Sequence, residues 1–264
     1  MVPVDLRAAR DALRRQTPRT MELLGSITDP GAPIPGSEWT VGEAAAHLAI
    51  GAEGYADYAQ GRDRRHPVDL TDVPGSHRRA FEGMPERDGR RLAEMLRDGI
   101  ERFLDATGGR SAADALRWHG GLTLSCAATT CTLLGEQLLH GWDIAGTANA
   151  SWQIGPDWAR LVIAGVAPIF ELRNRHGDAT VDLEYELAVE GGPRLFVTFR
   201  HGKLAIRPAA SGPVDCRLAG DPVSWVLALY GRLPWEELLD AGRITVVGGD
   251  AGAAPAFKHL LRNP

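Results

Sequence analysis

The chain has 264 residues, a formal net charge of -5 and a pI near 5.9. Hydrophobic residues make up 44% and charged residues 24%, which is ordinary for a globular protein and excludes a largely disordered one. The length predicts one large or two smaller domains. Because the acidic balance gives no general attraction to nucleic acid or anionic membranes, neither is expected as a partner.

No apolar run is long enough to cross a membrane, and the N-terminus carries Asp5 and Arg7 where a secretory signal would be apolar. A cytoplasmic location is therefore expected, while the oligomeric state stays open with a monomer favoured. The high alanine, glycine and arginine content is typical of GC-rich bacterial genomes. Cys126, Cys131 and Cys216 include no Cys-x-x-Cys pair. We expect them to be buried, reduced thiols.

The first predicted elements are helices. Apolar residues three or four apart predict a helix over residues 6–27, which Pro18 should break or kink. After a loop rich in proline and glycine, residues 40–43 read Thr-Val-Gly-Glu. This is a capping box, with Thr40 as N-cap and Glu43 reaching back to its backbone. It predicts that a second helix begins at residue 41.

Residues 61–87 are polar and contain proline, which predicts a long loop, and the basic residues 62–65 are interpreted as solvated. Clean helical periodicity returns over residues 92–103. A further helix, about residues 122–146, is apolar on nearly every side. Such a helix is typical of the centre of a bundle.

Beyond about residue 150 the pattern changes. A helix over 157–172 is followed by period-two alternation, which predicts strands. The predicted strands lie within 181–189, 195–199, 204–206, 214–218 and 244–247, with helices after Pro222, Pro234 and Ala251. We therefore predict the α+β class, with a helical bundle over residues 1–150 and an α+β domain over residues 151–264.

The candidate chemistry lies on the helix at 122–146. Between Leu122 and Trp142, Glu136 is the only carboxylate and His140 the only imidazole. They are four residues apart and so share one helical face. Burying an isolated carboxylate costs several kcal/mol, so Glu136 must be paired, protonated or bound to metal. The helix contains no lysine or arginine, whereas a metal ion would satisfy both side chains.

A third ligand is expected from a neighbouring helix, and His47 is the candidate because it adjoins apolar positions of the second helix. Two histidines and one glutamate leave a coordination position open, as in catalytic zinc sites. Asp143 could hold the other ring nitrogen of His140 or supply a fourth contact. The alternative stays open that His47 is an ordinary core histidine, because a single Glu-x-x-x-His pair is a weak signal.

Two motifs give the chain a family resemblance. The stretches WTVGEAAAHL at residues 39–48 and LGEQLLHGWDIA at 134–145 resemble those of the mycothiol-dependent maleylpyruvate isomerase family, a branch of the DinB-like metal-binding four-helix bundles. The resemblance implies that His47, Glu136 and His140 bind zinc. Residues 221–231 and 241–250 resemble the small sterol-carrier-like α/β domain that often follows this bundle.

The resemblance also implies a mechanism. A small thiol, mycothiol in the family, would coordinate the ion, lose its proton and attack an electrophilic, maleylpyruvate-like substrate, giving an isomerase or an S-transferase. Glu136 and Asp143 are the candidate catalytic carboxylates, and Thr132 is the candidate cofactor contact. Arg78 and Arg79 are candidate carboxylate clamps, although a solvated pair in the long loop is the favoured alternative. His119, just before the metal helix, is a candidate for the mouth of the site.

Two other functions remain open. The second domain could bind a lipid or another apolar ligand while the bundle serves as a scaffold. The same ligands would also serve a metal-dependent hydrolase that activates water. The sequence favours the thiol-dependent enzyme over the scaffold, because a polar line inside an apolar core lowers stability and has no purpose in a scaffold.

Overall fold

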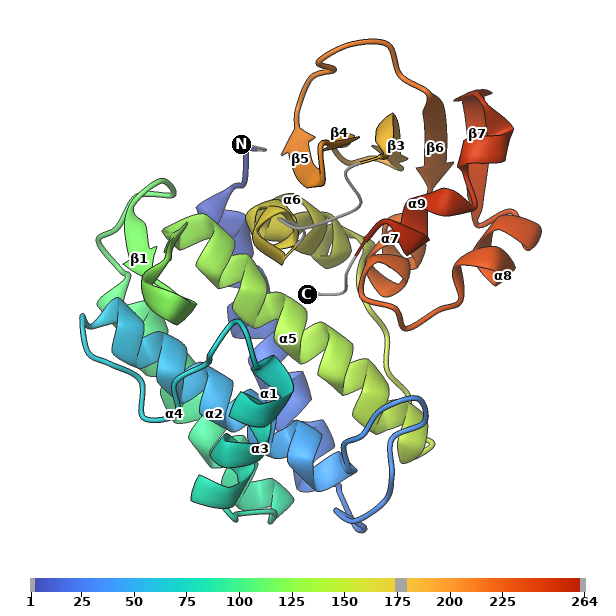
Figure 1. The fold of residues 1–264 in the computed structure, drawn as a ribbon. Coiled ribbons are helices and arrows are strands. Elements are labelled where there is room, and N and C mark those ends of the chain that lie inside the picture. The colour runs from blue at the N-terminus through green and yellow to red at the C-terminus, as the bar shows by residue number, and fades with distance from the viewer. Residues whose placement is uncertain (1–2, 174–179, 262–264) are drawn as a thin grey trace. The chain divides into compact units, whose positions relative to one another are not determined.

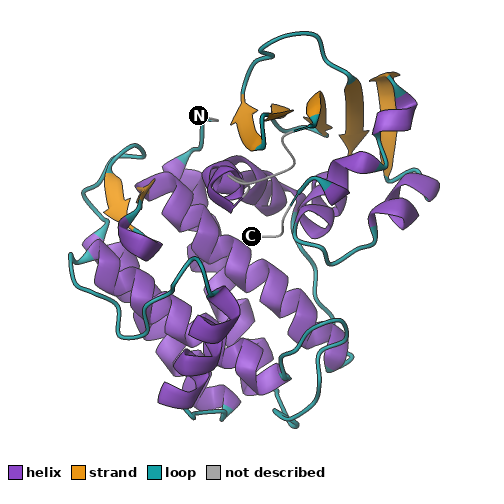
Figure 2. Ribbon diagram, in the orientation of Figure 1, coloured by secondary structure: helices purple, strands orange, loops and turns teal. Residues whose placement is uncertain are grey.

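The computed structural model describes residues 3–173 and 180–261. The chain forms two compact units, a helical unit over Asp5–Gln153 and a sheet unit over Ile154–Pro264 with Met1–Val4. The predicted α+β class, with helices preceding the sheet, is confirmed (Figures 1 and 2). Within the described residues, no helix has the length and apolar character needed to span a membrane.

Four long helices make up the bundle of the helical unit: α1 (Leu6–Gly25), α2 (Val41–Ala59), α4 (Gly89–Ala106) and α5 (Cys126–Thr147). Each packs against two neighbours, so that α2 contacts α4 and α5, and α1 also contacts both. A Cβ atom at Gly99 of α4 would come within 2.8 Å of the Ala52 backbone of α2. The absence of a side chain there allows the two helices to approach closely.

The ends of these helices follow local sequence signals. The predicted capping box at Thr40 and Glu43 is confirmed, with both of its hydrogen bonds present. Pro18 does not break the first helix, since α1 continues through it. In α5 the N-cap is Ser125, whose hydroxyl accepts a hydrogen bond from the Ala128 N–H.

Two predictions for this unit were wrong. The expected loop at 61–87 contains a helix, α3 (Val73–Gly83), capped by Asp72 and begun by a proline in its first turn. Residues 122–125 do not belong to the last helix. Instead, β1 (Ala115–Arg117) and β2 (Thr123–Ser125) form a short antiparallel hairpin around the 3-10 turn η1 (His119–Gly121).

The sheet unit begins with α6 (Pro156–Arg173) and contains a five-stranded sheet in the order β5-β4-β3-β6-β7. Its strands are β3 (Asp182–Val189), β4 (Arg194–Arg200), β5 (Lys203–Arg207), β6 (Cys216–Gly220) and β7 (Ile244–Gly249). Only the central β3–β6 pair is parallel. The remaining helices are α7 (Pro222–Leu229), α8 (Trp235–Asp240) and α9 (Ala256–His259), with the 3-10 turn η2 at Ala251–Ala253. Helices α6 and α7 lie along one face of the sheet (Figure 2).

Candidate metal centre

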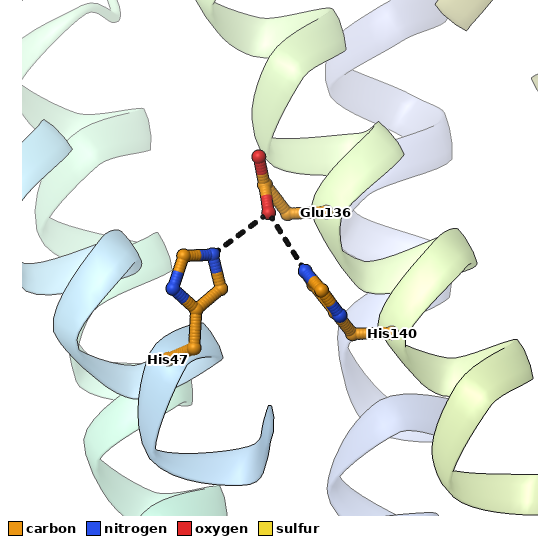
Figure 3. A group of neighbouring side chains, drawn as sticks. All are labelled: His47, Glu136 and His140. Atoms are coloured by element: carbon orange, nitrogen blue, oxygen red, sulfur yellow. Dashed lines mark hydrogen bonds and ion pairs between the residues drawn. The ribbon is translucent and has the colours of Figure 1, made fainter. Parts of the chain in front are cut away.

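Helices α2 and α5 pack side by side and bring His47 next to Glu136 and His140, the first of which lies 89 residues later in the chain. His47 projects from the second turn of α2, while Glu136 and His140 project from one face of α5 (Figure 3). The register of α2 is fixed by its capping box and by alanines that are fully buried beside His47. The three side chains therefore meet because two regular helices that pack against each other carry them on their facing sides.

The spacing of the three ligand atoms suits a tetrahedral metal ion. Nε2 of His47 lies 3.1 Å from Oε2 of Glu136, and Nε2 of His140 lies 3.4 Å from the same oxygen. With metal–ligand bonds of about 2.0–2.1 Å, two ligands of a tetrahedral ion are roughly 3.3 Å apart. All three ligand atoms lie within 4.8 Å of one another. The donor set, two imidazoles and a carboxylate, matches that of catalytic zinc sites.

Asp143 fixes the orientation of the His140 ring. Its Oδ2 lies 3.1 Å from Nδ1 of His140, one turn further along α5. Because an ionised carboxylate only accepts hydrogen bonds, Nδ1 carries the proton and donates it. The lone pair of the neutral ring is then on Nε2, which faces Glu136. This is the arrangement that holds a metal-ligating histidine in its binding tautomer.

The electrostatics of the cluster also favour a cation. Burial alone raises the pKa of Glu136, but hydrogen bonds and charge from His140 and His47, when these imidazoles are protonated, outweigh this and lower the pKa well below its ordinary value. Burial is the main reason that the pKa of His47 is lowered. The cluster therefore tends to hold an ionised carboxylate beside a neutral imidazole, which are the protonation states in which both groups bind metal.

Two aromatic side chains that did not enter the ligand prediction border the cluster. The Trp39 indole stacks on His140 with ring centroids 5.4 Å apart, and it also contacts His47 at 4.9 Å. His77 of α3 packs edge-on against His47 at 4.9 Å and against Trp39 at 5.1 Å. Sequence analysis missed His77 because it treated α3 as loop. The signal for α3 was the Asp72 cap followed by Pro74.

The arginines proposed as carboxylate clamps point elsewhere. Arg78 and Arg79 are both exposed, and Arg79 bonds to Asp72 and to the Ser76 hydroxyl within its own helical segment. Since His77 is the residue of α3 that faces the cluster, its two successors are turned about 100° and 200° away around the helix. The structure therefore does not bring these two arginines to the triad.

The remaining predicted residues, Thr132 and His119, both lie in the helical unit. Thr132 is buried one turn before Glu136, and its hydroxyl donates to the Ala128 carbonyl. His119 is 9% exposed and packs against the Trp118 and Tyr55 rings. Its Nδ1 lies 3.4 Å from Nη1 of Arg64. The interpretation of residues 62–65 as wholly solvated is wrong for Arg64, whose Nε is buried.

Comparison with known proteins gives a consistent picture of the fold. Residues 10–145, more than half of the chain, match the family model described as the mycothiol maleylpyruvate isomerase N-terminal domain. The crystal structure of the mycothiol-dependent maleylpyruvate isomerase superposes with a TM-score of 0.58 at 16% identity, covering 94% of this chain and 95% of that chain. A histidine-to-alanine mutant of that isomerase gives a TM-score of 0.57 with the same identity and coverage.

A ubiquinone synthesis protein, UbiJ-SCP2, aligns with 38% of this chain and 92% of its own at 20% identity. Its TM-score of 0.32 is too low to support an argument about the sheet unit. No curated protein sequence matches the chain.

Proposed function

Since the chain belongs to the family of the mycothiol maleylpyruvate isomerase N-terminal domain, we propose that it is a metal- and thiol-dependent isomerase or S-transferase. Its thiol cosubstrate is mycothiol, and its substrate is a small electrophile resembling maleylpyruvate. The observation that carries this proposal is the triad of His47, Glu136 and His140, whose atoms are spaced for one divalent ion. Zinc suits this donor set best.

The proposed ion needs an open coordination position, and the triad supplies only three ligands. Among the described residues, the group of ligating side chains that could hold a metal contains no fourth member. A divalent ion bound there would supply a Lewis acid that ionises a coordinated thiol at neutral pH. The Glu136 side chain is 31% exposed, so a small molecule can approach the cluster from that side.

The protein's own thiols cannot supply the nucleophile. Cys126, Cys131 and Cys216 are each buried and unpaired. Burial raises the pKa of the Cys131 thiol to about 12 and also raises the pKa of Cys216. A thiolate at neutral pH is therefore more readily supplied by a small molecule, which supports mycothiol as cosubstrate.

The residues around the triad have roles that follow from their contacts. Asp143 keeps the proton of His140 on Nδ1, so Nε2 stays available as a ligand. Trp39 covers the two imidazoles and limits the access of water to them. The low pKa of Glu136 keeps a negative charge beside the cation at neutral pH.

The proposed reaction balances without an external oxidant or reductant. The thiolate adds to one carbon of a cis double bond, and the electron pair of that bond moves to the conjugated carbonyl oxygen. The remaining single bond rotates, the electron pair returns, and the thiolate leaves, so that the trans isomer forms. In an S-transferase the carbon–sulfur bond would persist and the adjacent carbon would take up a proton.

Cobalt substitution tests this proposal. If thiol occupies the open position, millimolar mycothiol should produce a sulfur-to-cobalt charge-transfer band in the cobalt-loaded protein. Isomerisation of maleylpyruvate should then require both metal and mycothiol and should be lost in Glu136→Gln. Turnover that does not depend on thiol, without a sulfur-to-cobalt charge-transfer band, would favour the hydrolase. No turnover together with a co-purifying lipid would favour the binding protein.

A further inference from the structure

Arg64 is the feature near the triad that neither the fold nor the proposed metal site explains. Its neighbours in sequence and space are ordinary surface cations. Nη2 of Arg62 lies 2.6 Å from Oδ1 of Asp57, and Nη2 of Arg117 lies 2.7 Å from Oδ1 of Asp63. In contrast, no carboxylate in the described part of the chain forms an ion pair with Arg64. Its Nε is buried and has no hydrogen-bond partner there.

The guanidinium of Arg64 lies against the face of α2 that carries His47. A Cβ atom placed on Gly54 would come within 2.8 Å of both Cζ and Nε of Arg64. Gly54 is seven residues after His47, so the two positions share one helical face about 10 Å apart along the axis. Gly54 thus leaves room for the guanidinium two turns from the metal ligand.

Aromatic and neutral groups complete the surroundings of Arg64. The Tyr58 ring centre lies 6.0 Å from Cζ, and Nδ1 of His119 accepts a hydrogen bond from Nη1 at 3.4 Å. These contacts orient the guanidinium but do not neutralise it. Burial is the main cause of the lowered pKa of His47, and the positive charge of Arg64 is a smaller contribution in the same direction.

We propose that Arg64 binds a carboxylate of the electrophilic substrate, so that this site selects carboxylate-bearing electrophiles. The inference rests on the proposed function and names the substrate class and the residue that recognises it. A guanidinium forms paired hydrogen bonds with a carboxylate, and an unpaired Nε–H beside a terminal N–H provides such a pair of donors. A carbon chain of about six bonds of about 1.5 Å each, plus one hydrogen bond, spans roughly the 10 Å that separates Gly54 from His47 along the axis of α2.

Direct binding of a probe tests the inference. Maleate, a small cis dicarboxylate, should bind the zinc-loaded protein in calorimetry, and Arg64→Gln should weaken that binding at least about tenfold. Arg64→Lys should be intermediate, because lysine keeps the charge but loses the planar pair of donors. The matched control is Arg65→Gln, which removes the same charge from an exposed neighbour and should leave maleate affinity unchanged.

Further readouts separate binding from folding. Zinc content and thermal unfolding should be unaltered in Arg64→Gln, and dimethyl maleate, which lacks the charges, should not distinguish the variants. If Arg64→Gln binds maleate as tightly as the unaltered protein, or if maleate does not bind at millimolar concentration, the inference is wrong.

Kinetics separate this inference from the proposed function. In Arg64→Gln the KM for maleylpyruvate should rise at least about tenfold, while the cobalt–mycothiol band persists. Absence of thiol-dependent turnover, with maleate binding still dependent on Arg64, would refute the isomerase and leave the carboxylate site standing. Normal turnover with unchanged KM in Arg64→Gln would refute the carboxylate site alone.

Discussion

Each unit of the chain holds a carboxylate between two basic side chains, but with different consequences. In the helical unit both imidazoles converge on a single oxygen of Glu136. In the sheet unit Glu186 offers a separate oxygen to each arginine, with Oε1 2.5 Å from Arg194 and Oε2 3.2 Å from Arg217. The Glu186 side chain is buried, whereas both arginines are largely exposed.

The difference lies in what the basic groups can do. An imidazole can lose its proton near neutral pH and then offers a lone pair to a metal ion. A guanidinium keeps its proton at every accessible pH and has no lone pair to offer. The cluster around Glu136 can therefore exchange protons for a cation, while Glu186 and its two arginines form salt bridges between strands and offer a metal no nitrogen ligand. A carboxylate between basic side chains therefore indicates a metal site only when those side chains can also act as ligands.

The largest expected difference between the two clusters is in metal binding. His140→Ala should lose the bound ion, because two remaining ligands cannot retain an exchangeable metal. The expected result is about one divalent ion per chain in the unaltered protein and almost none in the variant, measured by elemental analysis after dialysis. Glu186→Gln is the matched control and should keep its metal in full. Stoichiometric metal in a His47→Ala, His140→Ala double variant would refute the site.

The effect on the free energy of unfolding should be larger for a substitution of Glu186 than for one of Glu136, the opposite of the order expected for metal content. Glu186→Gln removes the charge from between two arginines and should lower the free energy of unfolding by about 1–3 kcal/mol. The cost stays below that of a fully buried pair because water can reach both arginines. In metal-free protein at neutral pH His47 is uncharged, so Glu136→Gln loses little charge attraction to it, and the amide oxygen still accepts a hydrogen bond; stability should therefore change by about 1 kcal/mol or less. Urea unfolding of both variants measures this ranking, and a larger loss for Glu136→Gln would reverse it.

The sequence predicts the triad's grouping because it depends on regular helices. Periodicity and the capping box fix which faces of α2 and α5 turn inward, and two inward faces in one bundle must meet. The sheet unit was predictable for a similar reason, because strict alternation marks its strands.

The features that escaped prediction depend on short or irregular segments. Helix α3 buries only Ser76, Ala80 and Phe81 among its eleven residues, too few to give a clear apolar period. The strands β1 and β2 are three residues each, and their pairing is set by the turn at Gly120 and Gly121, both with positive φ. The position of Arg64 against α2 depends on a loop that no periodic pattern describes.

A third carboxylate, Glu184, extends the comparison, because Ser211 donates to it from two uncharged groups. It is fully buried on β3 and accepts hydrogen bonds from the Ser211 N–H at 2.8 Å and the Ser211 hydroxyl at 2.6 Å. Burial alone raises the pKa of Glu184, but the bonds from Ser211 and the charge of Arg200 outweigh this and lower it. Neutral donors can thus stabilise a buried carboxylate without creating a metal site.

The smallest predicted effect follows from the sign of that shift. Because the pKa of Glu184 is lower in the folded chain than in the unfolded one, its ionised form contributes stability above about pH 4.5, and this contribution is lost as the pH falls through the folded pKa. Ser211→Ala removes one donor and raises the folded pKa. At pH 7 the variant should be less stable by about 1 kcal/mol, and the difference should shrink as the pH falls below 4.5. Urea unfolding of both proteins across this range measures it. If the stability difference stays constant with pH, the Ser211 hydroxyl acts through packing. The low pKa of Glu184 would then come from its other partners, the Ser211 N–H and Arg200.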